Sequence, residues 1–207
     1  MPIEQEIEIE FTLRPDLDPT LGRYVLAFEG RASAWDGSIA DERQIGTIRG
    51  HRVDLVTAVS DELNQVELLE SLTPEIADFS HIVLANARCI LPPDGEEEPP
   101  TECDCLVYIA ELWVEPDYRG RGVGTLFLKR LGATIDLNRC LIALKALPLR
   151  VDHTQTSTRE EVERVKRFYE RLGFQAAGGD YMVKDARHCD AMKKRLAGRR
   201  GPEKGSH

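Results

Sequence analysis

Three glycines at alternate positions, accompanied by two arginines, have the clearest chemical potential in this sequence. They form the segment Arg119-Gly120-Arg121-Gly122-Val123-Gly124. Glycine allows positive φ angles and lets a ligand approach the backbone closely. If a helix begins here, its first amides lack intrahelical partners and point outward with the positive end of the helix dipole. The segment therefore predicts an anion site with Arg119 and Arg121 as charge-assisted donors, and a diphosphate is its natural ligand. The alternative is a surface turn with solvated arginines.

The elements expected on either side of this loop favour the anion site. Residues 106–114 are rich in β-branched and aromatic side chains, which predicts a buried strand. Pro116 cannot donate to a sheet ladder, so pairing should stop there. Apolar residues then recur every four positions across residues 123–135, which predicts one face of a helix. A strand, a glycine-rich loop and a helix in this order are typical of a phosphate-binding turn.

Two common nucleotide motifs do not fit the loop. The dinucleotide fingerprint Gly-x-Gly-x-x-Gly fails because Thr125 or Phe127 takes its last position. The Gly-Lys-Ser/Thr of a nucleotide-triphosphate P-loop is absent from the segment. The loop instead resembles the GNAT superfamily of acetyl-CoA-dependent N-acetyltransferases, whose signature Arg/Gln-x-x-Gly-x-Gly/Ala is met by Arg119, Gly122 and Gly124.

A second match to this superfamily lies downstream, in Phe168-Tyr169-Glu170-Arg171-Leu172-Gly173-Phe174. The resemblance covers roughly residues 106–183 and implies a mixed α/β (α+β) fold with acetyl-CoA as co-substrate. The expected sheet is mostly antiparallel, flanked by helices, and splayed between two central parallel strands. We expect residues 1–186 to form one GNAT-like domain and residues 187–207 to form a basic helix or tail, partly flexible.

The resemblance also assigns residues to the coenzyme. The backbone at the end of the predicted strand would hold the pantetheine and the acetyl carbonyl, and the loop amides would hold the diphosphate. The expected coenzyme-binding residues are Leu112, Trp113, Val114, Arg119, Gly120, Arg121, Gly122, Val123, Gly124, Thr125 and Tyr169. Many members carry an asparagine seven residues before the tyrosine. Val162 stands at that position here, so any coenzyme contact from that side chain is missing or supplied otherwise.

Tyr169 and Glu111 are the predicted catalytic residues. By resemblance, the Tyr169 hydroxyl approaches the coenzyme sulfur, and a phenol of pKa about 10 can donate to a thiolate of pKa about 8.5. The alternative is a core tyrosine. Glu111 is the candidate base, because burial on an apolar strand would raise its pKa toward the working range. Strand alternation places Glu111 on the face of Trp113, opposite Leu112. Its alternative role is a structural carboxylate paired with an arginine. Weaker candidates for the base are Glu29, Tyr108 and His153.

The rest of the chain predicts an alternation of strands and helices. Further strands are expected at residues 3–13, 24–35, 44–59, 87–91, 140–147 and 174–183, with a bulge at Gly50. Further helices are expected at 61–72 and 73–83, and at 157–172 behind a capping box at 157–160. The acidic, proline-rich segment 92–100 is most simply a solvated hairpin tip. It could also draw a cationic amine toward the site.

Composition narrows the range of partners. The net charge of -9 argues against non-specific nucleic-acid binding and favours cationic ligands. No apolar run approaches the roughly 20 residues of a membrane span, and the acidic N-terminus does not resemble a signal peptide. Five scattered cysteines fit a reducing cytoplasm, and we interpret them as small buried hydrophobes. A metal at Cys103-Asp104-Cys105 with Cys89 is disfavoured by the spacing, so no metal is expected.

The predicted function is a cytoplasmic N-acetyltransferase that moves an acetyl group from acetyl-CoA to a primary amine of a small molecule or protein. The amine would attack directly in a ternary complex. No nucleic-acid or membrane partner is expected, and homodimer formation is left open. A non-catalytic acyl-CoA-binding module and a peptide-binding structural domain are the competing interpretations. Aminoglycoside, polyamine, amino acid and protein N-terminus all stay open as acceptors.

Overall fold

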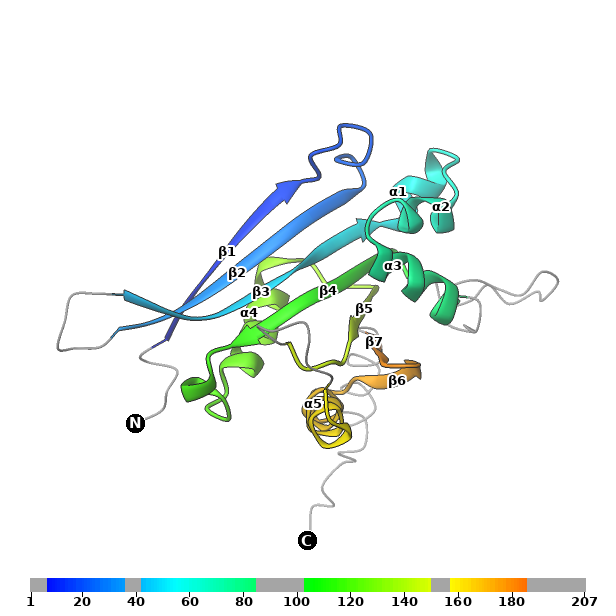
Figure 1. Ribbon diagram of the computed structural model, residues 1–207. Helices are drawn as coiled ribbons and strands as arrows, with labels where there is room; N and C mark the ends of the chain where they lie inside the picture. The colour runs from blue at the N-terminus through cyan, green and yellow to red at the C-terminus, as the bar shows by residue number, and fades with distance from the viewer. Residues whose placement is uncertain (1–6, 36–41, 85–102, 150–156, 186–207) are drawn as a thin grey trace, which may run out of the picture.

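The computed structural model describes residues 7–35, 42–84, 103–149 and 157–185. These residues form one seven-stranded sheet in the order β1-β2-β3-β4-β5-β7-β6 (Figure 1). Only β4 and β5 run parallel, and the other neighbours are antiparallel, which confirms the predicted mixed sheet. The strands are β1 (Ile7–Pro15), β2 (Val25–Trp35), β3 (Glu42–Asp54), β4 (Cys105–Val114), β5 (Cys140–Lys145), β6 (Gln175–Gly178) and β7 (Tyr181–Asp185).

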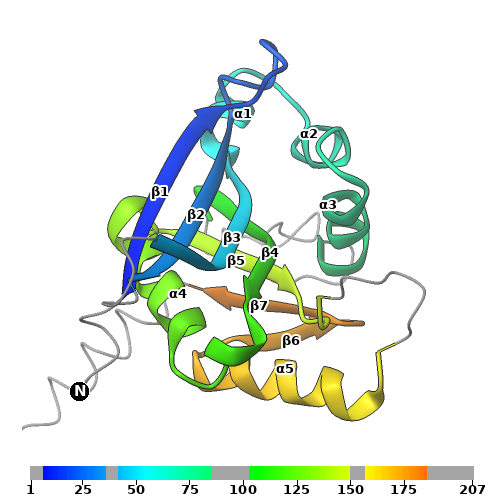
Figure 2. The same cartoon turned by 60° about the vertical axis from the view of Figure 1, so that its left-hand side comes forward.

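Helices cover both faces of this sheet (Figure 2). One face carries α1 (Leu55–Ser60), α2 (Gln65–Glu70), α3 (Pro74–Phe79) and the π-helix η2 (Ser80–Leu84). The other carries α4 (Val123–Thr134) and α5 (Arg159–Arg171), and the short 3-10 helix η3 (Pro116–Tyr118) leads into the glycine loop. We call these the α1–α3 face and the α4/α5 face. Each face has its own hydrophobic core.

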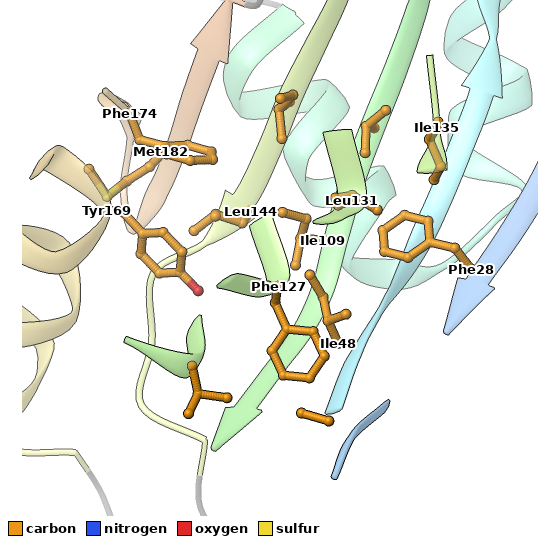
Figure 3. Packing of buried hydrophobic residues seen from close by; sticks show 14 of the residues in the cluster. Phe28, Ile48, Ile109, Phe127, Leu131, Ile135, Leu144, Tyr169, Phe174 and Met182 are labelled. Atoms are coloured by element: carbon orange, nitrogen blue, oxygen red, sulfur yellow. The ribbon is translucent and has the colours of Figure 1, made fainter. Parts of the chain in front are cut away.

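The core on the α4/α5 face anchors the helix that follows the glycine loop. Phe127 and Leu131 of α4 are buried against Ile48 of β3 and Ile109 of β4 (Figure 3). Tyr169 reaches into the same core from α5, beside Phe174 and Met182. Because the predicted four-residue spacing from Val123 buries Val123, Phe127 and Leu131, the sequence pattern for α4 is confirmed.

The segment between β3 and β4 differs from the sequence prediction. The strand expected to run to residue 59 ends at Asp54, whose Oδ1 accepts from the Thr57 amide at 2.9 Å and caps α1. The helix expected to begin at residue 61 begins instead at Gln65, because Asn64 caps α2 and Glu62 has a positive φ of 62°. Thr73 caps α3, so this helix begins at Pro74, close to the start expected at residue 73.

The C-terminal elements are close to the prediction. The capping box of α5 joins Thr158 to Glu161, one residue later than expected. Gly173 follows the helix with a φ of 88°, as expected of a glycine at this position. The single strand expected at 174–183 is a hairpin of β6 and β7, in which Gly178 pairs with Tyr181 and the turn lies at Gly179 and Asp180. The predicted strand at 87–91, the acidic segment, His153 and the tail from residue 187 lie outside the described residues.

A disulfide joins Cys105 of β4 to Cys140 of β5. The two residues are register partners in the parallel pair, with Cα atoms 4.6 Å apart, and both are buried. The interpretation of all cysteines as simple buried hydrophobes is therefore wrong for this pair, because a single sequence does not show which residues two strands bring together. Cys103 is a buried thiol, and Cys89 and Cys189 lie outside the described residues.

Candidate active site

The sheet opens between β4 and β5. Their pairing runs from Cys105 opposite Cys140 to Ile109 opposite Leu144 and ends there. Beyond this point β4 continues to Val114 and pairs only with β3. The β5 side of the last residues of β4 is therefore a free strand edge, which is the predicted splay between the two central parallel strands. A free edge presents backbone N–H and C=O groups to a ligand.

A β-bulge in β4 lies at the start of this opening. In the β3–β4 register, Arg49 faces Glu111 while Gly50 faces Ile109, so Ala110 is the extra residue. Before the bulge, Ile109 points into the α4/α5 core; after it, Leu112 packs against that core. Glu111 consequently lies on the α1–α3 face, opposite Leu112. This agrees with the alternation predicted for Glu111.

A cleft of about 590 Å³ lies on the α4/α5 face, where the free edge of β4 meets the glycine loop and α5. The residues predicted for the coenzyme line this cleft, with the exception of Arg121: Leu112, Trp113, Val114, Arg119, Gly120, Gly122, Val123, Gly124, Thr125 and Tyr169. Other lining residues were not predicted from the sequence. They are Tyr118 before the glycine loop, Leu147, Pro148 and Leu149 after β5, Glu161, Arg164, Val165, Phe168 and Arg171 of α5, and Leu172 at its C-terminal end.

The backbone of the glycine loop is open toward solvent and ligand. Gly120 and Gly122 have φ angles of 73° and 90°, and a Cβ at either position would meet no atom within 4 Å. These two glycines therefore serve backbone conformation rather than packing. Gly122 is the N-cap of α4. As a glycine it has no side chain that could bond to the amides of the first helical turn. The amides of the first turn of α4 are thus available for a diphosphate, so the residues present fit the predicted anion.

The two arginines of the loop have different surroundings. The Nε of Arg119 donates to the carbonyl oxygen of Val114 at 2.9 Å, while the residue also lines the cleft. The guanidinium of Arg121 lies 5.2 Å from the centre of the Tyr118 ring, away from the described cleft wall. Arg119 therefore has both a structural bond and access to an anion in the cleft. Arg121 has a cation–π contact instead.

Tyr169 is a buried side chain at the inner end of the cleft. Its ring packs against Phe168 and Phe174, with centroid distances of 4.9 and 5.5 Å. Burial raises the pKa of the Tyr169 phenol, because the low-dielectric surroundings disfavour the phenolate. The hydroxyl therefore stays protonated at neutral pH and can act as a hydrogen-bond donor in the cleft. Tyr169 therefore packs in the core, as one of the two sequence alternatives held, and also lines the cleft.

Glu111 lies outside the described cleft wall and takes part in a row of ion pairs across three strands. Its Oε2 lies 3.6 Å from Nη1 of Arg49, and Nη2 of Arg49 lies 3.9 Å from Oε1 of Glu29. The Glu111 side chain is 34% exposed, so the full burial assumed for a base on an apolar strand is absent. The alternative role, a carboxylate paired with an arginine, describes its observed contacts. Glu29 also accepts from Nε of Arg31 at 2.8 Å, which lowers the pKa of the Glu29 carboxyl.

Residues 78–176 match the family model described as an acetyltransferase (GNAT) domain. Over these residues the chain is similar to the GNAT acetyltransferases. GNAT domains use acetyl-CoA, which identifies the anion that fits the glycine loop. The match includes β4, the loop, α4, β5 and α5, and so covers the cleft. No curated protein sequence matches the chain.

Several solved structures resemble this chain. AtaTR bound with AcCoA has 12% identity and a TM-score of 0.46, covering 91% of this chain and 99% of that chain. Arabidopsis thaliana NAA60 in complex with a bisubstrate analogue has 17% identity and a TM-score of 0.39, covering 86% and 99%. AtaT complexed with acetyl-methionyl-tRNAfMet has 10% identity and a TM-score of 0.42, covering 90% and 99%.

The net charge of -9 predicted that the protein has no nucleic-acid partner, and this prediction is wrong. One of the solved structures similar to this chain is a complex with a tRNA. Net charge sums all residues, whereas phosphate binding depends on the local arrangement of arginine and lysine side chains. Such side chains do occur together here: Arg119, Arg164 and Arg171 all line the cleft. Separately, the described helices are all too short or too polar to cross a bilayer.

Proposed function

We propose that this protein is an N-acetyltransferase that moves an acetyl group from acetyl-CoA to a primary amine, which attacks directly in a ternary complex. One observation carries the proposal: the glycine loop, the free edge of β4 and Tyr169 line the same cleft of about 590 Å³. The loop suits a diphosphate, the free edge suits an extended amide chain, and Tyr169 suits a leaving sulfur. Acetyl-CoA has these three parts in this order.

The coenzyme would be held mainly by backbone groups. The amides of the first turn of α4 and the open loop at Gly120 and Gly122 would bind the diphosphate. The unpaired edge of β4 over residues 112–114 would bind the pantetheine as an added strand. Val165 of α5 and Leu172 at its C-terminal end supply apolar surface in the same cleft. Many members of the family have an asparagine at the position of Val162. Because the contacts proposed here use backbone groups, coenzyme binding would not depend on that asparagine.

Tyr169 and Glu111 would divide the proton transfers. Acetyl-CoA supplies the acetyl group as an activated thioester. Tyr169, kept neutral by burial, would donate to the departing sulfur. Glu111 lies on the other face of β4, one residue past the bulge, and would accept the proton that the attacking amine must lose, directly or through a water. Arg49 would hold the Glu111 carboxylate in place.

A non-catalytic acyl-CoA-binding module is the second candidate. The pairing of Glu111 with Arg49 favours it, because the ion pair accounts for this carboxylate without a catalytic role. Both candidates predict coenzyme binding, whereas the peptide-binding structural domain predicts none. Thermal unfolding with acetyl-CoA separates that third interpretation, since ligand at about 100 times Kd stabilises by about 2.7 kcal/mol.

Release of free thiol from acetyl-CoA over a panel of amines tests the catalytic proposal. The panel should hold a polyamine, an aminoglycoside, an amino acid, a peptide N-terminus and an aminoacyl-tRNA. We expect turnover with at least one amine and its loss in Glu111→Gln and Tyr169→Phe. Glu10→Gln is the matched control, because Glu10 is an exposed carboxylate on β1. If both variants bind coenzyme and turn over like the control, the catalytic roles are wrong.

A further inference from the structure

β1 is an edge strand of the sheet. Among the described residues it pairs with β2 and with no second strand, so one side of its backbone has no partner strand there (Figure 1). The strand is nine residues long, and its register against β2 runs without a shift. Lysine is absent from Ile7–Pro15, and its proline stands at the last position. Bulges, lysines and short length are the usual protections of a strand edge, so β1 can accept a further strand.

The side chains of β1 alternate between an apolar and a polar face. The apolar side chains lie on the α4/α5 face, at the rim of its core: Ile7, Ile9, Phe11 and Leu13. The polar side chains are exposed on the opposite face: Glu8, Glu10, Thr12 and Arg14. Leu13 is 42% exposed although it is apolar. A strand added beside β1 would therefore remove apolar surface from water as well as pair backbone groups.

The apolar face of β1 is complementary to itself. When Phe11 lies opposite Phe11 of a second copy in an antiparallel pair, the whole of Ile7–Pro15 is paired. In this register every side chain meets one on the same face of the sheet. Ile9 then lies opposite Leu13 of the second copy, and the exposed Leu13 gains an apolar neighbour. Aromatic and aliphatic pairs of this kind stabilise adjacent strands.

The charged face selects the same register. Glu8 lies opposite Arg14 of the second copy, and symmetry repeats this pair, while Glu10 lies opposite Thr12. A shift by two residues keeps the faces but loses the match. A pair centred on Glu10 places two carboxylates opposite each other, which is unfavourable. A pair centred on Thr12 joins only residues 9–15 and leaves Glu8 without a cation.

We propose that two copies of this chain associate through β1, in an antiparallel pair centred on Phe11, so that their sheets join into one. Such a dimer has twofold symmetry, because each copy contributes the same strand. Its contact is confined to one strand of each copy, so we expect a weak dimer with a Kd in the micromolar range. The residues of β1 do not line the cleft, and the dimer is independent of the proposed acetyl transfer.

Sedimentation velocity of the full chain from about 1 to about 300 µM measures the dimer Kd. Glu8→Arg and Arg14→Glu each place like charges opposite each other twice, and each should raise the Kd about tenfold. The double variant restores opposite charges and should return the Kd to within a factor of about three of the wild type. Because both side chains are exposed, we expect the variants to keep the wild-type circular dichroism spectrum.

Glu10→Arg is the matched control, because it makes the same charge change on the same face of β1 but opposite Thr12. It should change the Kd by less than a factor of about three. A monomer over the whole concentration range overturns the proposal. So does a dimer whose Kd is the same in Glu8→Arg and in the wild type, since it forms through another surface. A larger effect of Glu10→Arg than of Glu8→Arg would refute the register.

Amide hydrogen exchange of the wild type needs no variant. The amides of β1 that point away from β2 should exchange more slowly at concentrations above the Kd than below it. Fast exchange of these amides at every concentration contradicts the proposed pairing. Protection that does not change with concentration would show that another segment of the same chain covers this edge, and it too would overturn the proposal.

Discussion

Arg119 ties the glycine loop to the end of β4, because its Nε donates to the carbonyl oxygen of Val114 at 2.9 Å. The bond spans the turn formed by η3 and holds the loop beside the free strand edge. Both ends of the bond belong to residues that line the cleft. The relative position of the diphosphate site and the pantetheine edge therefore depends on this contact.

Arg119→Ala should weaken acetyl-CoA binding by about tenfold, since it removes a charged donor from the cleft and the bond that positions the loop. Calorimetry gives the Kd directly. Arg121→Ala is the matched control: it removes the same charge from the same loop but from a side chain on the Tyr118 ring. We expect it to change Kd by less than a factor of about three. Equal losses in both variants would show that general positive charge, rather than the bond to Val114, sets the affinity.

Gly50→Ala should destabilise the fold by about 3 kcal/mol or more. A Cβ at Gly50 would overlap the carbonyl oxygen of Tyr108 and lie 2.5 Å from the Phe28 ring, so β3 and β4 would have to separate at the bulge. Urea unfolding measures the loss. Gly132→Ala is the control, because its Cβ would meet only the Leu137 side chain, at 3.2 Å, and alanine favours the interior of α4. A Gly50 variant as stable as this control would contradict the observed β3–β4 register.

Stability should fall as the pH rises above about 10. Burial raises the pKa of Tyr181 to about 12, and it also raises the pKa of Tyr108 and Tyr169 above the usual value of about 10. Between these values the unfolded chain loses phenol protons that the folded protein keeps. The folded state then binds more protons, so the free energy of unfolding decreases with pH. The stabilisation that comes from these buried phenols is fully present below pH 10 and is lost as the pH rises through their folded-state pKa values.

Urea midpoints from pH 8 to 11.5 measure this slope. Tyr181→Phe should reduce the slope above pH 10, although it lowers stability at pH 8 by removing the bond to the Glu75 carbonyl. A slope that is the same in the variant and in the wild type would show that Tyr181 ionises equally in both states.

The coenzyme side of the site could be predicted from the sequence because its signals are local. Pro116 ends a strand, the alternate glycines permit the turn, and the apolar spacing from Val123 marks the helix face. These signals depend on residues that are close together in the sequence. The loop and the end of β4, which they identify, line the cleft in the structure. Apart from Tyr169, the residues of α5 that line the cleft were not predicted, because the amphipathic pattern of residues 159–171 shows which side is apolar but not what faces it.

The α1–α3 side of β4 could not be predicted in the same way. β4 is apolar at nearly every position up to Ile109, so alternation cannot reveal that Ala110 is an extra residue. The segment Leu55–Ser60 contains two valines, so its composition predicts a strand. It forms α1 instead, because the Asp54 side chain caps the N-terminus of the helix. The ion pair of Glu111 with Arg49 joins strands far apart in sequence. It depends on register, which only the folded sheet defines.

Reduction of the Cys105–Cys140 disulfide should lower the free energy of unfolding. The bond closes a loop with a sequence separation of 35 residues. For a loop of this length, chain entropy corresponds to about 4 kcal/mol, and observed values for native disulfides are about 2–5 kcal/mol. Intact mass before and after treatment with a reductant under denaturing conditions shows whether the bond is present. Urea unfolding of Cys105→Ala and Cys140→Ala, compared with the double variant, then isolates its contribution.

The double variant should be no less stable than either single variant, because each single change already removes the whole bond. Acetyl-CoA affinity should be almost unchanged in all three, since the bond lies at the start of the parallel pair and the cleft at its far end. Cys103→Ala is the control for loss of a buried thiol without loss of a cross-link. If Cys103→Ala costs as much stability as Cys140→Ala, packing of buried sulfur rather than the cross-link stabilises the junction of β4 and β5.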